Sequence, residues 1–221
     1  MWLIKLIKRE IFNLKHKDTR PITDPIILKN FLKHLREDSS MGERNYAIFQ
    51  TGKATLLRVS DVLALKKSEV FQSNGRVKKN AFIVDKKTKK QNRLYLNPIR
   101  DVLEDYYDWL QEYQQKHPYK KFFSSEWLFP SSRRLGEDVP IRENSFYRIC
   151  HQTGLKIGVN WIGSHSMRKT GAFMVYQQTN HNTALVMKLL NHSSEAMTLR
   201  YLGLEQERRE ALLDQVNFNQ L

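Results

Sequence analysis

The sequence predicts a mainly α-helical protein that carries one small antiparallel β-sheet, an α+β fold. Apolar residues recur at helical spacing along most of the 221 residues, and residues 81–97 read as two short apolar strands around a polar, lysine-rich turn. A hydrophobic content of 40% with 27% charged residues is typical of a globular chain that buries its own core. This length suits one large domain, and no repeat or long linker divides it.

The first helices are marked by capping and breaking residues. Asp24 is a predicted N-cap and Pro25 a first helical residue, and the apolar positions that follow share one buried face. The next stretch predicts two more helices. We expect them to separate near Gly52, with Ser60 and Asp61 available to cap the second.

The middle of the chain changes in character after residue 70. Asn74 and Gly75 are a strong signal for a tight turn between short strands, and the lysine-rich turn predicts a second hairpin. Helical spacing returns from Ile99 to Tyr113, most simply as a face packed in the core and not as a platform for stacking. Four successive helices are then expected between residues 142 and 204.

The two ends of the chain have distinct predictions. Residues 1–20 form a basic amphipathic segment whose lysines interrupt the apolar run, so we expect neither a signal peptide nor a membrane span. A helix that packs on the domain or on a neighbour is predicted there, with a membrane-surface helix as the alternative. Residues 21–221 form the main domain. In its predicted last helix, one side carries Leu212, Leu213 and Val216.

Charge and cysteine content indicate the partner and the compartment. The 37 Lys and Arg against 23 Asp and Glu give a net charge of +14, which favours nucleic acid as the partner. The single Cys150 cannot form an internal disulfide, which indicates a reducing cytoplasm. Neither CxxC nor HExxH occurs, so no metal or cofactor is predicted.

A set of residues in a fixed order could act on a phosphate. His165 and Arg168 are three residues apart, so on a helix they share a face, where a guanidinium can hold two phosphate oxygens beside an imidazole. Alone this pair is a weak signal. Two arginines, a lysine, two histidines and a tyrosine are the groups needed to cut a phosphodiester without metal, and the chain offers them in the order Arg58, Lys87, His165, Arg168, His192 and Tyr201.

This ordered set resembles the tyrosine recombinases, or phage-type integrases. The resemblance covers roughly residues 22–215 and implies a tyrosine recombinase catalytic domain for residues 21–221. Arg58 matches the family's first catalytic arginine, with Asp61 as a supporting acidic residue that helps to orient it. The hairpin lysine matches Lys87, although a shift of one residue within Lys86–Lys90 would reassign it. Asn191 stands where the family commonly has glycine.

The resemblance implies a mechanism and partners. Arg58 and Arg168 clamp the phosphate with help from His192, Tyr201 attacks, and the product is a 3′-phosphotyrosyl link. By the same reasoning His165 is the candidate proton acceptor, and the hairpin lysine protonates the departing 5′-oxygen. Double-stranded DNA, a homotetramer on that DNA and a monomer without it are implied, as is a prokaryotic cytoplasm with its nucleoid.

Two other functions remain open at this level. Family members usually begin with a core-binding domain that closes around DNA, and only about twenty residues precede the matched region here. A DNA-binding remnant or accessory protein without productive recombination is therefore one alternative. A type IB topoisomerase, which resembles the family in its chemistry, is the other.

Overall fold

The computed structural model confirms the predicted fold class. It describes residues 19–86, 89–132, 137–204 and 213–215, and these form nine α-helices, one 3-10 helix and a two-stranded antiparallel sheet. In chain order the elements are α2 (Pro25–Glu37), α3 (Gly42–Thr55), α4 (Val59–Val62), α5 (Lys67–Val70), β1 (Asn80–Val84), β2 (Gln91–Tyr95), η1 (Asn97–Ile99), α6 (Arg100–Lys116), α7 (Glu143–Lys156), α8 (Ser166–Gln178), α9 (Thr183–Leu190) and α10 (Glu195–Leu202).

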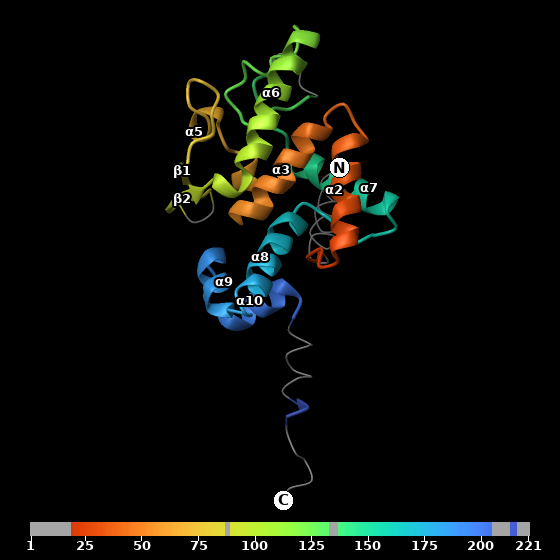
Figure 1. Ribbon diagram of the computed structural model, residues 1–221, viewed down its shortest axis with the longest axis vertical. Helices are drawn as coiled ribbons and strands as arrows, with labels where there is room; N and C mark the ends of the chain where they lie inside the picture. The colour runs from red at the N-terminus through yellow and green to blue at the C-terminus, as the bar shows by residue number, and fades with distance from the viewer. Residues whose placement is uncertain (1–18, 87–88, 133–136, 205–212, 216–221) are drawn as a thin grey trace, which may run out of the picture.

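The helices form two groups that meet where α3 crosses α8. Helices α2, α3, α6 and α7 form the larger group, with β1 and β2 at its edge, and α8, α9 and α10 form the smaller group below it (Figure 1). The larger group shares one continuous core, and a second, smaller core lies between α8, α9 and α10. No helix in the described ranges is both long and apolar enough to cross a membrane.

Helix α2 begins where the capping residues predicted. The Asp24 carboxylate accepts hydrogen bonds from the backbone N–H groups of Ile26 (2.7 Å) and Ile27 (3.2 Å), and Pro25 is the first helical residue. The apolar face of the helix is buried through Phe31, whose ring lies 5.0 Å from that of Phe49 on α3. The cap therefore fixes the start of a helix whose face then docks on α3.

The two predicted helices form, but the break between them lies beyond Gly52. Helix α3 continues to Thr55 and ends only at Leu56, which has a left-handed φ of 55°. Gly52 is needed instead for helix packing, because a Cβ there would lie 2.3 Å from the sulfur of Met167 on α8. Gly171 of α8 is equally close, with a Cβ position 1.9 Å from the carbonyl oxygen of Lys53. Two glycines thus bring α3 and α8 into near-backbone contact.

The predicted capping of the following helix is wrong. Arg58 occupies the N-cap position of the short helix α4, without a capping hydrogen bond from its side chain. Ser60 and Asp61 lie inside that helix. The Asp61 carboxylate is used elsewhere, as an acceptor for the backbone N–H of Lys86. A tertiary contact has therefore replaced the local cap.

The lysine-rich hairpin forms as expected, and the earlier turn forms without its strands. β1 and β2 pair antiparallel, with Ala81 opposite Leu94, both buried, and Phe82 opposite Arg93, both exposed. At the Asn74–Gly75 turn, Gly75 has a φ of 82°, but only a single bridge joins the two sides. Of the two predicted hairpins, the lysine-rich one thus forms as a paired β-hairpin with alternating buried and exposed residues.

Helix α6 buries the predicted stripe. Leu103, Tyr106, Leu110 and Tyr113 are buried, and the Tyr106 hydroxyl donates a 2.9 Å hydrogen bond to the carbonyl oxygen of Leu128. This face is therefore part of the core, as the sequence predicted.

Two other predictions lie largely outside the described residues. They concern the segment 1–20 and, in the predicted last helix, Leu212 and Val216. Leu213 is described and exposed.

Replacing Gly171 with alanine tests the contact between α3 and α8. The added methyl group meets the backbone of Lys53, so we expect Gly171→Ala to lower the free energy of unfolding by about 1–3 kcal/mol through overpacking. Urea denaturation measures this change. Gln178→Ala, at the exposed end of the same helix, is the matched control and should stay within about 0.5 kcal/mol of the wild type. An unchanged Gly171→Ala protein contradicts the close packing.

Candidate active site

The contact between α3 and α8 brings two arginines to one cavity. Arg58 follows the end of α3, and Arg168 is the third residue of α8. Both line a cavity of about 270 Å³ together with the acidic residues Asp61 and Asp85. Residues that are far apart in the sequence are thus assembled into one polar site.

Arg168 is deeply buried, at 5% exposure. One terminal nitrogen donates a 2.9 Å hydrogen bond to the carbonyl oxygen of Leu190, which fixes the guanidinium against the end of α9. Its Nε has no hydrogen-bond partner among the described residues. Burial lowers the pKa of Arg168, and the neighbouring charge of Arg58 lowers it further. A buried cation with a donor to spare is well suited to bind an anion.

Asp61 links the first arginine's helix to the lysine-rich hairpin. One carboxylate oxygen accepts a 2.9 Å hydrogen bond from the backbone N–H of Lys86, and the other is buried without a partner within the described chain. No ion pair between Arg58 and Asp61 occurs among the described contacts. Asp61 therefore holds the base of the hairpin. Lys87, the predicted hairpin lysine, lies outside the described residues.

His192 is presented by a helix end that needs a left-handed residue. Asn191 terminates α9 with a φ of 56°, a conformation that glycine and asparagine tolerate best, so asparagine can replace the usual glycine there. The Nδ1 atom of His192 lies 3.2 Å from the Thr198 hydroxyl. Burial lowers the pKa of His192, and the positive charges of Arg168 and Arg58 lower it further. The imidazole is thus neutral at neutral pH.

Tyr201, on α10, is surrounded by these groups. Its ring meets the His192 ring edge to face at 5.2 Å, and the guanidinium carbon of Arg168 lies 6.0 Å from the ring centre. The hydroxyl is buried and has no hydrogen-bond partner in the described part of the chain. Burial raises the pKa of Tyr201 to about 12, although the charges of Arg168 and Arg58 oppose the shift. The phenol is therefore protonated at neutral pH.

His165 is half-buried and lies just before α8, not within it. It occupies the N-cap position with a helical φ of −74°, so it precedes Arg168 by about one turn, as the spacing predicted. The structure thus gathers Arg58, Asp61 and Arg168 around one cavity, with His192 beside Tyr201 next to Arg168.

Sequence reasoning missed three residues at this site. Asp85 is buried at the end of β1 and lines the same cavity as the two arginines. Thr198 contacts His192, and the ammonium of Lys169 lies 5.1 Å from the centre of the Tyr201 ring. Lys169 directly follows Arg168 in the sequence, and this position was a weak signal that it belongs to the site. Nothing local in the sequence indicated a role for Asp85 or Thr198.

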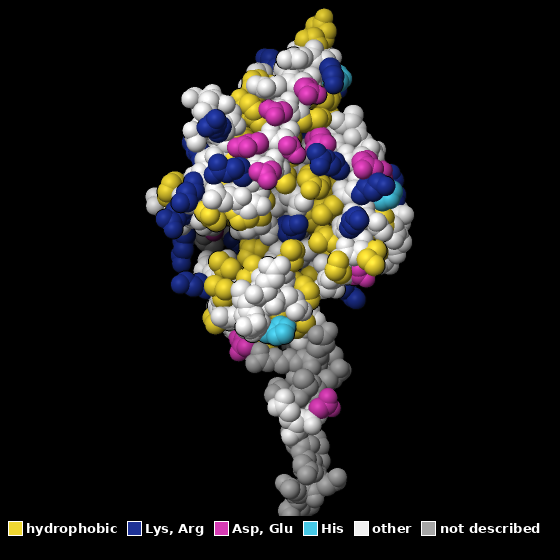
Figure 2. Space-filling view, in the orientation of Figure 1, with side chains coloured by type: hydrophobic (Ala, Val, Ile, Leu, Met, Phe, Trp, Pro, Cys, Tyr) yellow, Lys and Arg dark blue, Asp and Glu magenta, His cyan; other side chains and the backbone are white. Residues whose placement is uncertain are grey.

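A basic surface adjoins the site. Lys and Arg side chains gather along the edge of the molecule formed by β1 and β2 (Figure 2). The exposed basic residues on and beside this hairpin are Arg76, Lys79, Lys86, Lys89, Lys90 and Arg93. A surface of this kind attracts the phosphates of a nucleic acid.

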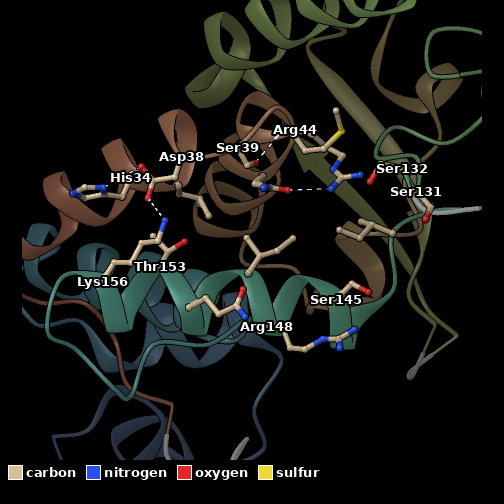
Figure 3. Close-up of a pocket in the computed structure, with 16 residues that line it drawn as sticks. His34, Asp38, Ser39, Arg44, Ser131, Ser132, Ser145, Arg148, Thr153 and Lys156 are labelled. Atoms are coloured by element: carbon tan, nitrogen blue, oxygen red, sulfur yellow. Dashed lines mark hydrogen bonds and ion pairs between the residues drawn. The ribbon is translucent and has the colours of Figure 1, made fainter. Parts of the chain in front are cut away.

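Another cavity, of about 350 Å³, lies between α2 and α7 and is separate from the site. In Figure 3, Lys156 of α7 points to Asp38 at the end of α2, and the two are joined by a 2.8 Å ion pair. Arg44, from α3, lies on the far side with Ser131 and Ser132. None of the candidate catalytic residues lines this cavity.

The chain belongs to the phage integrase family, whose sequence model matches residues 24–208. A curated relative is the probable integrase/recombinase YoeC of Bacillus subtilis (strain 168). It is 28% identical over 169 residues, which cover 76% of this chain and 82% of that protein. The expected resemblance to this family is therefore confirmed.

Solved structures of recombinases share the fold. The XerH site-specific recombinase bound to palindromic difH substrate matches with a TM-score of 0.60 and 22% identity, over 89% of this chain and 53% of that chain. XerA recombinase matches with a TM-score of 0.58 and 20% identity, over 90% of this chain and 66% of that one. A lambda integrase tetramer bound to a Holliday junction matches with a TM-score of 0.58 and 16% identity, over 85% of this chain and 49% of that chain. The chain thus spans about half the length of XerH and lambda integrase.

Replacing Asp61 with alanine tests its hold on the hairpin. The variant leaves the part-buried N–H of Lys86 without its acceptor, so we expect faster hydrogen exchange at that amide. Exchange measured by mass spectrometry or NMR across β1 and β2 gives the answer. Asp108→Ala, on the exposed face of α6, is the control and should leave the hairpin unchanged. Equal protection in both variants contradicts the link.

Proposed function

We propose that this chain is the catalytic part of a site-specific DNA recombinase that cuts and rejoins strands through a 3′-phosphotyrosyl intermediate. The observation that carries the proposal is the convergence of Arg58, Arg168 and His192 on the buried phenol of Tyr201. Membership of the phage integrase family supports the same function. Residues 21–221 form its catalytic domain, and residues 1–20 form a basic N-terminal segment that precedes it.

The two arginines are suited to stabilise the attacked phosphate. Negative charge grows on the nonbridging oxygens as the phosphorus is attacked, and fixed cations in a buried site oppose that charge at no reorganisation cost. Arg168 has an unpartnered N–H and a fixed guanidinium for this purpose. Arg58 lines the same cavity, and His192 can donate to a phosphate oxygen in the tautomer that carries its proton on Nε2, with Nδ1 accepting from the Thr198 hydroxyl.

The chemical step exchanges one ester bond for another. The Tyr201 oxygen forms a bond to phosphorus, the bond from phosphorus to the 5′-oxygen breaks, and the energy stays in the new phosphotyrosyl ester. The phenol proton passes to His165, because a phenol with a pKa near 12 needs an acceptor during attack. Lys87 donates a proton to the departing 5′-oxygen. A new 5′-hydroxyl then reverses the step, so neither metal nor ATP is required.

Double-stranded DNA is the proposed partner. The net charge of +14 and the basic hairpin edge favour binding to its phosphates. The related structures of XerH on difH and of a lambda integrase tetramer on a Holliday junction support binding to DNA, and the second supports a homotetramer there. A monomer in the absence of DNA is part of the same proposal. For the last helix that the sequence predicts, with Leu212, Leu213 and Val216 on one side, we propose docking on a neighbouring subunit. The prokaryotic cytoplasm, beside the nucleoid, is the proposed compartment.

A suicide substrate tests the cleavage chemistry. On DNA nicked so that the 5′-fragment diffuses away, we expect covalent adducts in a buffer that contains a chelator and no nucleotide. Tyr201→Phe should form none and still bind DNA, whereas Tyr119→Phe, at a 93% exposed position, should react as the wild type does. Gel electrophoresis under denaturing conditions measures the adduct. Binding without adducts in the wild type would favour the remnant, and efficient relaxation of plasmids without a special site would favour the topoisomerase.

Arg168 gives a quantitative test of charge stabilisation. We expect Arg168→Ala to slow adduct formation by about 10²–10³-fold, the cost of losing one oriented donor in the transition state. Arg168→Lys should recover little of this loss, since an ammonium cannot reproduce the guanidinium's hydrogen bonds to both Leu190 and the phosphate. Single-turnover kinetics at saturating DNA measure both rates. A near-normal rate in Arg168→Ala removes this residue from the clamp.

A further inference from the structure

Lys169 contacts two parts of the molecule that are distant in sequence. Its Nζ donates a 2.6 Å hydrogen bond to the carbonyl oxygen of Thr19. The same ammonium lies 5.1 Å from the centre of the Tyr201 ring, within the range of a cation–π contact. One charge therefore joins the first described residue of the chain to the proposed nucleophile.

The segment Thr19–Ile22, the incoming segment, is fixed on α8 next to this lysine. The Ile22 N–H donates a 2.9 Å hydrogen bond to the Thr170 hydroxyl, and both residues are buried. Thr19 is only 3% exposed, and its methyl group lies where a Cβ on Gly163 would come within 2.6 Å. The incoming segment is therefore packed tightly against the residues around the start of α8. A shift of one is expected to move the other.

Contacts to its ring, and not to its hydroxyl, set the orientation of Tyr201. The hydroxyl has no hydrogen-bond partner among the described residues, so it exerts no such restraint on the side chain. His192 meets the ring at its edge, and Lys169 is closer to the ring centre than Arg168, at 5.1 Å against 6.0 Å. Lys169 is partly buried, and burial lowers its pKa. An ammonium in such a place is stabilised by its two partners, a carbonyl and an aromatic face.

We propose that Lys169 is a positioning residue that holds Tyr201 in its buried orientation and couples that orientation to the incoming segment. The inference rests on the proposed function only in taking Tyr201 as the nucleophile. Because one ammonium serves both partners, displacement of Thr19 alters the restraint on Tyr201. Whatever moves the incoming segment thereby alters how readily the phenol leaves its buried position.

Chemical nitration of tyrosines in the DNA-free, full-length chain tests the proposal. Tetranitromethane modifies accessible phenols, and peptide mass spectrometry gives the extent at each tyrosine. Exposed Tyr119 is the reference for free reaction, and Tyr106, at 1% exposure, is the reference for protection. We expect Tyr201 to react several-fold faster in Lys169→Met than in the wild type, while both reference residues keep their rates.

Further variants separate positioning from general stability. Lys169→Arg keeps a cation on the ring face and should keep Tyr201 protected, whereas Lys169→Gln should expose it as Lys169→Met does. Lys156→Met removes a lysine on α7 that is paired with Asp38, and it is the matched control. The proposal is overturned if Tyr201 stays protected in both the Met and Gln variants, or if Lys169→Arg exposes it equally. An accompanying rise at Tyr106 marks general loosening and also counts against positioning.

Thr170→Val tests the coupling to the incoming segment. It removes the acceptor of the Ile22 N–H without touching Lys169, so we expect a smaller increase in Tyr201 nitration. No increase overturns the coupling. The suicide substrate reports on the proposed function separately: adducts without any nitration effect overturn the role of Lys169 alone, and absent wild-type adducts with the nitration effect overturn only the recombinase.

Discussion

The near-backbone contact between α3 and α8 is the constraint on which the site depends. Gly52 and Gly171 have no side chain, so the two helices approach more closely than any other residue would allow. Arg58 emerges just after one helix and Arg168 from the first turn of the other. The close approach that the two glycines allow thus brings Arg58 and Arg168 to one cavity.

Burial gives the site its electrostatic character. Arg168, Asp61 and Tyr201 each have a buried polar atom without a hydrogen-bond partner within the described chain, which is a costly arrangement unless another group completes it. A phosphate could satisfy the two donors among them. The low local dielectric would strengthen those contacts, and the same burial keeps the Tyr201 phenol protonated at neutral pH.

The two hydrophobic cores of the molecule each support a different part of the candidate site. The larger core fixes α3, α6 and the hairpin, and the small core between α8, α9 and α10 carries His192 and Tyr201 at its edge. The small core contains far fewer buried side chains than the larger one. The hydrogen bond from Lys169 to Thr19 joins the smaller group of helices to the segment that leads into the larger group.

The sequence by itself determined the fold class, the cap at Asp24, the lysine-rich hairpin and the family, because helical periodicity, capping and motif order are local properties. It placed the helix break too close to Gly52 and read Asp61 as a cap, since a glycine in a helix or an acid near its start looks the same whether its partner is local or distant. Only the tertiary structure decided those partners and revealed Lys169 beside Tyr201. The reason is physical: burial and charge proximity arise when helices pack, and no single segment contains that information.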